Sequence, residues 1–405
     1  MNTTRIPAIL VINSGSSSIK FAVFDDANLS ELVKGQIDGI GSHASFKVKS
    51  PDQRIHETIT WPQELAPQDH NAALKVILEW LHDVLSYVHI VAVGHRVVHG
   101  GAVYLEPVLI NDSVIHELES FYALAPLHEP HNISGIKAAR EVFGDIPQIA
   151  CFDTAFHRSQ SFINDTYALP RALYEEGVRR YGFHGLSYEF INSYVQRFLP
   201  AYFGKKTVVA HLGNGASLCA IEHGHAVATT MGFSPLDGIP MGSRSGQVDP
   251  GVLLYLMQYK QWDAQEISNL LYKESGLKGL SGGLSNDMRT LEASCAIEAK
   301  EAINYFVQNV QQEILSLAAV MQGLEVLIFT GGIGENSVFI REQVMQGLQW
   351  VGIELDAGAN IDGAQILSTT SSKVICLRIA TNEELMIAKH THNLSISRIP
   401  EPLGV

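Results

Sequence analysis

Short apolar runs that end at small polar residues alternate along the chain with longer stretches of helical periodicity. Apolar runs at residues 8–12 and 19–24 flank a polar bend, a pattern that predicts strand, tight turn and strand. Runs at 207–210 and 218–221 repeat this arrangement about half a chain later. The repeat suggests a duplicated domain with a ligand between the copies, although two Gly-rich turns can also coincide by chance.

The remaining elements alternate between strands and helices. Further strands are expected at 90–98, 149–152, 326–329 and 374–379, and helices at 71–86, 132–143, 253–259, 264–272, 297–321 and 337–347. Residues 231–250 contain glycines and prolines without periodicity, so a long functional loop is expected there. Strands that alternate with helices are typical of an α/β fold, and 405 residues suffice for two domains.

The bend at residues 13–20 has the composition of a phosphate-binding turn. Serine hydroxyls, such as those of Ser16 and Ser18, and backbone N–H groups can surround phosphate oxygens, and Lys20 supplies a cation. Asn13 ends the first strand, where its side-chain oxygen can reach a metal ion or its water shell. The alternative is an ordinary polar turn. No Walker motif, G-x-x-x-x-G-K-[ST], occurs in the chain.

Two charged residues lie in or directly after apolar strands. Arg96 interrupts the run at 90–98 and therefore needs an anionic partner, which is either a ligand or a carboxylate of the protein itself. Asp153 follows the strand at 149–152. Because the carboxyl ends of parallel strands face the ligand crevice, Asp153 is a candidate acid, base or metal-side carboxylate. Alternatively, it caps the turn that follows.

Three further segments carry candidate binding residues. Residues 179–185 present His184 between two glycines, where a buried structural histidine is the alternative. Arg244 lies between two serines in the long loop. Residues 331–336 form a Gly-rich turn between a strand and a helix, which favours anions. This turn does not complete a G-x-G-x-x-G pattern, so a dinucleotide fold is disfavoured.

Composition limits the partners of the chain. The formal net charge of −14 argues against nucleic acid or an anionic membrane as a partner. The first apolar run breaks at Asn13, too early for a signal sequence or a membrane-spanning helix. The four cysteines form no C-x-x-C motif and are interpreted as buried, reduced thiols of a cytoplasmic protein.

An ordered set of motifs over essentially the whole chain resembles the acetate kinase family, within the superfamily of acetate and sugar kinases, heat-shock chaperone ATPases and actin. The motifs are N-S-G-S-S-S-I-K at 13–20, G-H-R-V-V-H-G-G at 94–101, A-P-L-H at 125–128, F-D-T-A-F-H at 152–157, R-R-Y-G-F-H-G at 179–185, H-L-G-N-G-A-S at 211–217, G-I-G-E-N at 332–336 and T-N-E-E-L at 381–385. Single motifs are weak, but their order is highly specific.

The resemblance implies two actin-like (ribonuclease-H-like) α/β domains, each with a mixed sheet flanked by helices, and a nucleotide in the cleft between them. The implied domains are residues 1–152 and 153–383, with a closing helix at 384–405 that returns to the first domain. It also implies a homodimer that associates through the second domain.

The resemblance assigns roles to residues that match its motifs. Arg96 would bind the carboxylate substrate, with His128 near the phosphate. Asp153, His184 and Arg244 would be catalytic. The substrate methyl group would enter a small apolar pocket formed by Val98, Leu127, Phe183 and Pro235.

ATP or ADP and a metal ion are the implied cofactors. Asn13 and Glu383 would hold Mg²⁺, with Mn²⁺ as the alternative ion. The nucleotide would contact residues in several turns, namely Ser16, Ser18, Lys20, His211, Leu212, Gly213, Asn214, Gly215, Asp287, Met288, Arg289, Gly332, Ile333, Gly334, Glu335 and Asn336.

Several residues depart from the family pattern without removing a matched catalytic residue, so they bear on substrate preference and loop position. Glu129 replaces asparagine, Leu186 and Tyr188 replace threonine and histidine, Ala228 replaces aspartate, and Pro240 and Gln247 replace methionine and aspartate.

The implied function is reversible, ATP-dependent phosphorylation of acetate to acetyl phosphate. A carboxylate substrate is already ionised at neutral pH, so we expect Asp153 to orient metal and substrate rather than to remove a proton. Val98 leaves less room than alanine would, which favours acetate over propionate. A short-chain carboxylate kinase is a close alternative. An actin-like ATPase switch and a phosphate-ester or polyphosphate hydrolase are alternatives of other classes, but a switch needs no small-acid site.

Overall fold

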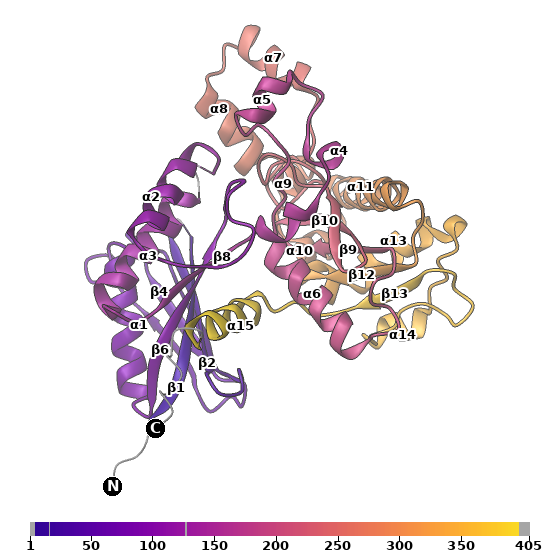
Figure 1. The fold of residues 1–405 in the computed structure, drawn as a ribbon. Coiled ribbons are helices and arrows are strands. Elements are labelled where there is room, and N and C mark those ends of the chain that lie inside the picture. The colour runs from indigo at the N-terminus through magenta and orange to yellow at the C-terminus, as the bar shows by residue number, and fades with distance from the viewer. Residues whose placement is uncertain (1–4, 16, 126–127, 397–405) are drawn as a thin grey trace. The chain divides into compact units, whose positions relative to one another are not determined.

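The protein divides into two compact units. The computed structural model describes residues 5–15, 17–125 and 128–396 (Figure 1). The first unit is Met1–Ala155 with Asn382–Val405, and the second unit is Phe156–Thr381. Each unit is built on its own mixed β-sheet, so the expected α/β class is confirmed.

Among the described residues, the first unit contains an eight-stranded sheet in the order β5-β4-β3-β2-β1-β6-β8-β7. The strands are β1 (Ile6–Ser14), β2 (Ser18–Asp25), β3 (Glu31–Asp38), β4 (Ser45–Lys49), β5 (His56–Thr60), β6 (Val88–Val97), β7 (Val108–Leu109) and β8 (Gln148–Phe152). Strand β1 pairs antiparallel with β2, as the predicted hairpin requires, and parallel with β6, which pairs parallel with β8. The carboxyl ends of β1, β6 and β8 therefore share one edge of the sheet.

Helices cover both faces of this sheet (Figure 1). Helices α1 (His70–Val84) and α3 (Glu129–Phe143) pack against a core formed by side chains such as Leu10, Phe21 and Val93. Helix α15 (Glu383–Ile396) packs on the opposite face, where Gly94 is required because a Cβ there would collide with Thr391. The rest of the unit contains α2 (Asp112–Ser120) and the 3₁₀ turn η1 (Phe121–Ala123).

The second unit repeats the central topology of the first. Its described sheet has the order β11-β10-β9-β12-β13, with β9 (Thr207–Leu212), β10 (Ala216–Glu222), β11 (His225–Thr229), β12 (Val326–Thr330) and β13 (Ile375–Arg378). Strand directions match those of β3-β2-β1-β6-β8, since β10 is antiparallel to both neighbours while β12 is parallel to both. The predicted duplication is therefore confirmed at the level of sheet topology.

Helices α6 (Gly185–Phe198) and α11 (Ile297–Met321) pack against the sheet of the second unit. The other helical elements of this unit are η2 (Ala155–Ser159), α4 (Phe162–Asp165), α5 (Arg171–Glu175), α7 (Pro250–Gln258), α8 (Ala264–Asn269), η3 (Leu270–Glu274), α9 (Gly276–Leu280), α10 (Met288–Glu292), α12 (Gly331–Asn336), α13 (Val338–Gly347), η4 (Gln349–Val351) and α14 (Ala357–Ile361). The long loop expected at 231–250 is confirmed, because residues 231–249 contain no helix or strand.

Two expectations are wrong. The segment predicted as a Gly-rich turn is itself the helix α12, which the carboxylate of Glu335 caps by accepting the N–H of Gly331 at 3.0 Å. Cys295 is exposed, whereas Cys151, Cys219 and Cys376 are buried as predicted.

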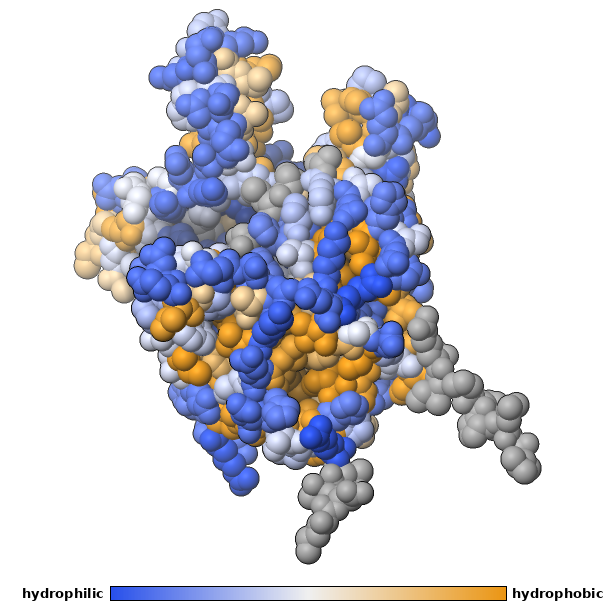
Figure 2. Space-filling model, turned by 90° about the vertical axis from the view of Figure 1, so that its left-hand side faces the viewer, coloured by the Kyte–Doolittle hydropathy of each residue, from blue (hydrophilic) through white to orange (hydrophobic). Residues whose placement is uncertain are grey.

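Hydrophilic side chains dominate the face shown in Figure 2, with hydrophobic areas between them. Within the described ranges, no helix has the length and apolar character needed to cross a membrane.

Candidate active site

Arg96 and Asp153 form a two-point ion pair at the edge of the first sheet. Arg96 lies near the end of β6, and Asp153 directly follows the neighbouring strand β8. Arg96 donates from Nε to Oδ1 at 3.0 Å and from Nη2 to Oδ2 at 2.6 Å. Burial tends to lower the pKa of Arg96, but the Asp153 and Glu383 carboxylates outweigh it and raise that pKa. The anionic partner of Arg96 is therefore a protein carboxylate, which was one of the two alternatives, while its side chain remains 20% exposed.

A second carboxylate shares this edge of the sheet. Glu383 begins α15, and its Oε2 lies 3.8 Å from the Nε of Arg96. Burial raises the pKa of Glu383 to about 7; Arg96 and Lys20 oppose this rise, whereas Asp153 and Glu384 add to it. The carboxylates at this edge are therefore only partly compensated by positive charge from the protein.

Asn13, the other residue predicted to hold a metal ion, belongs to the first unit, as Glu383 does. Asn13 on β1 lies directly opposite Lys20 on β2, and Lys20 is near enough to influence the pKa of Glu383. Mg²⁺ in nucleotide sites typically uses one or two carboxylates together with waters and phosphate oxygens. In the part of the chain that the structure describes, His, Cys, Asp and Glu side chains form no group of three or more suited to a metal. Water and phosphate would have to complete the coordination of such an ion.

Helix α3 connects the ends of β1 and β6 beneath this edge. The Asn132 side chain accepts the N–H of Val98 at 2.9 Å and donates to the carbonyl of Ser14 at 2.8 Å. Gly135, one turn later, allows close approach to Ser14, because a Cβ there would collide with its hydroxyl. Val98 is half-buried, as is His128, which immediately precedes α3. The helix thus fixes the backbone on which Arg96 and Val98 are placed.

Glu129 is a fully buried acid at the start of α3. Burial raises its pKa to about 8, the backbone N–H of His99 acts to lower it, and the Asp153 charge acts to raise it. The carboxyl group is therefore neutral through much of the neutral range. Sequence reasoning noticed this residue only as a departure from the family pattern.

The second unit brings two predicted histidines together. His184 precedes α6 with φ 58° and ψ 23°, a left-handed conformation that a non-glycine residue keeps only when its surroundings hold it. Its Nδ1 lies 2.9 Å from Ser217 Oγ, and its ring stacks on His211 with centroids 4.4 Å apart. Because Ser217 lies directly opposite His211 on β10 and β9, the strand pair and the first turn of α6 form one polar cluster.

Arg244 and His184 meet at the small-residue turn after β9. A Cβ built at Gly215 would lie 3.3 Å from His184 Nε2 and 3.8 Å from Arg244 Nη1. Arg244 Nη1 also donates to the carbonyl of Pro235 at 3.2 Å. Phe183, next to His184, is buried. The long loop therefore delivers a guanidinium to the same turn as the imidazole.

A cavity of ≈ 600 Å³ lies beside this turn in the second unit, within the size range of nucleotide and drug-sized ligands. Seven predicted nucleotide contacts line it: Asn214, Asp287, Met288, Arg289, Gly332, Ile333 and Asn336. It is also lined by three residues that sequence reasoning missed, which are Asn286, Glu292 and Ser337. The other predicted contacts in the second unit are not among its lining residues; they are His211, Leu212, Gly213, Gly215, Gly334 and Glu335.

Each unit thus carries part of the predicted site. The first unit holds Asn13, Ser18, Lys20, Arg96, Val98, His128, Asp153 and Glu383. The second holds Phe183, His184, Pro235, Arg244 and the nucleotide turns. Two predicted site residues, Ser16 and Leu127, lie outside the described residues.

The sequence model of the Acetokinase family matches residues 8–389. The chain belongs to the Acetokinase family. Its relatives include the acetate kinase of Methylocella silvestris, 49% identical over 95% of this chain and 96% of that relative, and that of Nitrobacter hamburgensis, 47% identical over 96% and 97%.

Solved acetokinase-like structures share the whole fold. A propionate kinase from Francisella tularensis aligns with a TM-score of 0.90 and 36% identity over 96% of this chain and 100% of that one. The acetate kinase of Porphyromonas gingivalis aligns with a TM-score of 0.87 and 35% identity over 96% and 99%.

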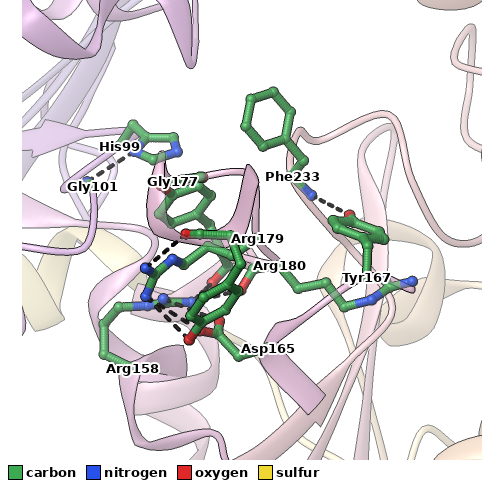
Figure 3. A network of polar contacts seen from close by, with 11 residues as sticks. His99, Gly101, Arg158, Asp165, Tyr167, Gly177, Arg179, Arg180 and Phe233 are labelled. Atoms are coloured by element: carbon green, nitrogen blue, oxygen red, sulfur yellow. Dashed lines mark hydrogen bonds and ion pairs between the residues drawn. The ribbon is translucent and has the colours of Figure 1, made fainter. Parts of the chain in front are cut away.

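Sequence reasoning missed an arginine that anchors the His184 segment of this acetokinase (Figure 3). Arg158 donates from Nη2 to the carbonyls of Arg180 and Tyr181 at 2.9 and 2.6 Å, and from Nη1 to Asp165 at 3.3 Å. Its side chain is 7% exposed, and burial lowers its pKa, although Asp165 opposes that shift. No local pattern reveals this network, because its members lie up to 23 residues apart.

Arg341 was missed in the same way. Its buried guanidinium donates to the carbonyls of Gly334 and Glu335 at 3.1 and 2.9 Å and to the side chain of Asn360 at 2.8 Å. Burial lowers the pKa of Arg341 to about 10, and Arg378 adds to this effect. These bonds secure the end of the Gly-rich helix α12, which the acetokinase motif G-I-G-E-N forms.

Proposed function

We propose that this protein transfers the terminal phosphoryl group of ATP to acetate, forming acetyl phosphate and ADP, and catalyses the reverse reaction. The observation that carries the proposal is the family match over residues 8–389, together with relatives named acetate kinase at 49% and 47% identity. The match includes all residues proposed below for the site.

Arg96 is proposed to bind the acetate carboxylate. Its Nε and Nη2 contact Asp153, but a guanidinium has more N–H donors than this pair uses. A bound carboxylate can therefore contact the remaining N–H groups, while Asp153 keeps the guanidinium in place. One acetate oxygen would then attack the terminal phosphorus in line, with a new O–P bond forming as the bond to ADP breaks.

His184 and Arg244 are proposed to stabilise the phosphoryl group during transfer. Phosphoryl transfer spreads charge over the equatorial oxygens, and donors aimed at those oxygens contribute most of the catalysis. Both side chains reach the Gly215 turn, beside the cavity in which the nucleotide is proposed to bind. Asp153, with both oxygens bonded to Arg96, is suited to orienting substrate rather than to accepting a proton.

Mg²⁺ is the proposed ion at Asn13 and Glu383, with Mn²⁺ as the alternative. Bound there, it would neutralise charge on the phosphates. The charge balance at this edge supports the assignment, because two carboxylates, Asp153 and Glu383, share the single guanidinium of Arg96.

Acetate is the proposed substrate in preference to propionate. The curated relatives reported above, at 49% and 47% identity, are named acetate kinase, whereas the two solved structures are a propionate kinase at 36% and an acetate kinase at 35%. Val98 favours the smaller acid, since an added methylene is worth ~1–3 kcal/mol in an apolar pocket.

A cytoplasmic homodimer that associates through the second unit is also proposed. Helix α7 of that unit supports the dimer, because its apolar side chains Val252, Leu254, Tyr255 and Met257 are between 45% and 55% exposed. An apolar surface of this kind commonly marks an interface. A second copy of the chain would cover it.

Trapping with hydroxylamine tests the reaction. The protein is incubated with ATP, Mg²⁺ and acetate in the presence of hydroxylamine, which converts acetyl phosphate to acetohydroxamate. The hydroxamate then forms a coloured complex with added ferric iron. The proposal predicts hydroxamate that depends on acetate. ATP loss without acetate would instead indicate a hydrolase or a nucleotide switch.

A further inference from the structure

Two stacked imidazoles in the second unit are held in the same manner. His184 Nδ1 lies 2.9 Å from Ser217 Oγ, and His211 Nδ1 lies 2.8 Å from Ser187 Oγ. Each serine hydroxyl also contacts a second hydroxyl. The Tyr188 hydroxyl lies 2.5 Å from Ser217 Oγ, and the Thr381 hydroxyl lies 2.8 Å from Ser187 Oγ.

The chain Tyr188–Ser217–His184 has a preferred direction. A phenol is a stronger hydrogen-bond donor and a weaker acceptor than an alkyl hydroxyl, because its oxygen lone pair is delocalised into the ring. When Tyr188 donates to Ser217, the single proton of the serine hydroxyl is left to donate to Nδ1 of His184. An imidazole that accepts at Nδ1 carries its proton on Nε2.

We propose that Tyr188 is a positioning residue that, through Ser217, keeps His184 in the neutral tautomer protonated on Nε2. This inference rests on the proposed function, in which His184 stabilises the transferring phosphoryl group. A protonated Nε2 gives an N–H donor to a phosphate oxygen. The other tautomer would direct a lone pair at the same oxygen and repel it.

The position of Nε2 supports this role. A Cβ built at Gly215 would lie 3.3 Å from His184 Nε2, and one built at Gly213 would lie 3.8 Å from His211 Nε2. Both Nε2 atoms therefore face the small-residue turn after β9, and Arg244 Nη1 approaches it at Gly215, on the side of His184. Ser217 contacts Nδ1, the other ring nitrogen of His184, and Tyr188 contacts Ser217.

An imidazolium form of His184 and His211 would also carry an N–H group on Nε2, but it is disfavoured. The ring centroids of His184 and His211 are only 4.4 Å apart and their planes differ by 22°, so two imidazolium charges would repel each other. Arg244, which meets His184 at Gly215, adds a third positive charge. A neutral ring with a defined tautomer supplies the N–H group without this cost.

Tyr188→Phe and Ser217→Ala test the inference by NMR in the full-length protein. Histidine is labelled with ¹⁵N, the His184 ring signals are assigned with His184→Gln, and long-range ¹H–¹⁵N correlations report which nitrogen carries the proton. The wild type is expected to show a protonated Nε2 and an unprotonated Nδ1. Both variants are expected to show a mixture of tautomers.

Kinetics supply the second measurement. Tyr188→Phe is expected to lower kcat about tenfold with little change in KM for ATP, because the tautomer affects a transition-state contact. Tyr194→Phe is the matched control, since it removes from the same helix a phenol hydroxyl that accepts a hydrogen bond from Gln365 at 3.0 Å. It should leave both kcat and the His184 tautomer unchanged.

Two results would overturn the inference: an Nδ1-protonated His184 in the wild type, or a Tyr188→Phe variant with unchanged tautomer and kcat. Ser217→Ala removes only one oxygen and provides the same NMR test if Tyr188→Phe does not fold. The NMR result is independent of turnover. A wild type with the expected tautomer but no acetyl phosphate formation would therefore refute the proposed function and leave the hydrogen-bond chain intact.

Discussion

Arg96 and Asp153 are joined at two points, Nε to Oδ1 at 3.0 Å and Nη2 to Oδ2 at 2.6 Å, where the parallel strands β6 and β8 end side by side. Two-point pairs between a guanidinium and a carboxylate fix orientation as well as charge. The cation proposed to bind the substrate and the carboxylate proposed to be catalytic are therefore coupled. A substitution at either residue should alter the orientation of the other.

Asp153→Asn is expected to lower kcat by ~10²–10³, because the amide keeps the shape of the side chain but removes the closest negative charge from Arg96. Any fall in the rate of the wild type toward low pH should persist in the variant, since ionised acetate needs no base. A pH-rate profile of both proteins checks this. Asp112→Asn, at a 93% exposed carboxylate of the same unit, is the control. Loss of this low-pH fall in Asp153→Asn would show that Asp153 is a base.

Val98→Ala is expected to increase kcat/KM for propionate relative to acetate by about tenfold, because the shorter side chain opens room for one methylene. The comparison requires kcat/KM for acetate, propionate and butyrate in both proteins. A wild type that prefers propionate, or an unchanged ratio in the variant, contradicts the placement of Val98 in the substrate pocket.

Glu129→Gln is expected to change how stability depends on pH. Burial raises the pKa of Glu129 from 4.5 to about 8, so between these values the folded protein keeps a proton that the unfolded chain has lost. The free energy of unfolding of the wild type therefore falls as pH rises through this window. The variant lacks this term, so its advantage over the wild type should grow by about 1.4 kcal/mol per pH unit.

Urea unfolding between pH 5 and 8 measures this difference. Glu141→Gln, at an exposed glutamate of the same helix, is the control and should show a difference that does not vary with pH. A constant difference for Glu129→Gln as well would mean that Glu129 is ionised throughout.

Glutamate substitutions at Leu254 and Met257 are expected to convert a dimer to a monomer, because charges on an apolar interface must be desolvated without partners. Light scattering after size-exclusion chromatography gives the mass of each protein. Glu266→Gln on the neighbouring helix α8 should remain dimeric. A monomeric wild type would contradict the proposed association through α7.

Much of the arrangement of the candidate site could be predicted because its residues lie at strand ends. The alternation of apolar residues located β1, β6 and β8, and parallel strands bring their carboxyl ends together, so the approach of Arg96 to Asp153 follows from their positions. The two hairpins were visible for the same reason, since each combines a period-two apolar pattern with a bend of small residues.

Other features depend on contacts that no local pattern contains. Gly331 and its neighbours have low helix propensity, yet α12 forms because Glu335 caps its first turn and Arg341 binds its last carbonyls. Helix α6 was missed although Leu186, Phe190 and related apolar residues recur at helical spacing. The contact between Tyr188 and Ser217 could not be predicted, because it depends on how α6 packs against β10.

The most direct test of the account is acetyl phosphate formation by Arg96→Gln. The variant and the wild type are supplied with ATP, Mg²⁺ and acetate, and ³¹P NMR follows the acetyl phosphate signal while calorimetry measures ATP binding. Arg96→Gln is expected to bind ATP as the wild type does but to form acetyl phosphate at least ~10²-fold more slowly. Formation at the wild-type rate would contradict the role of Arg96 as the acetate-binding residue.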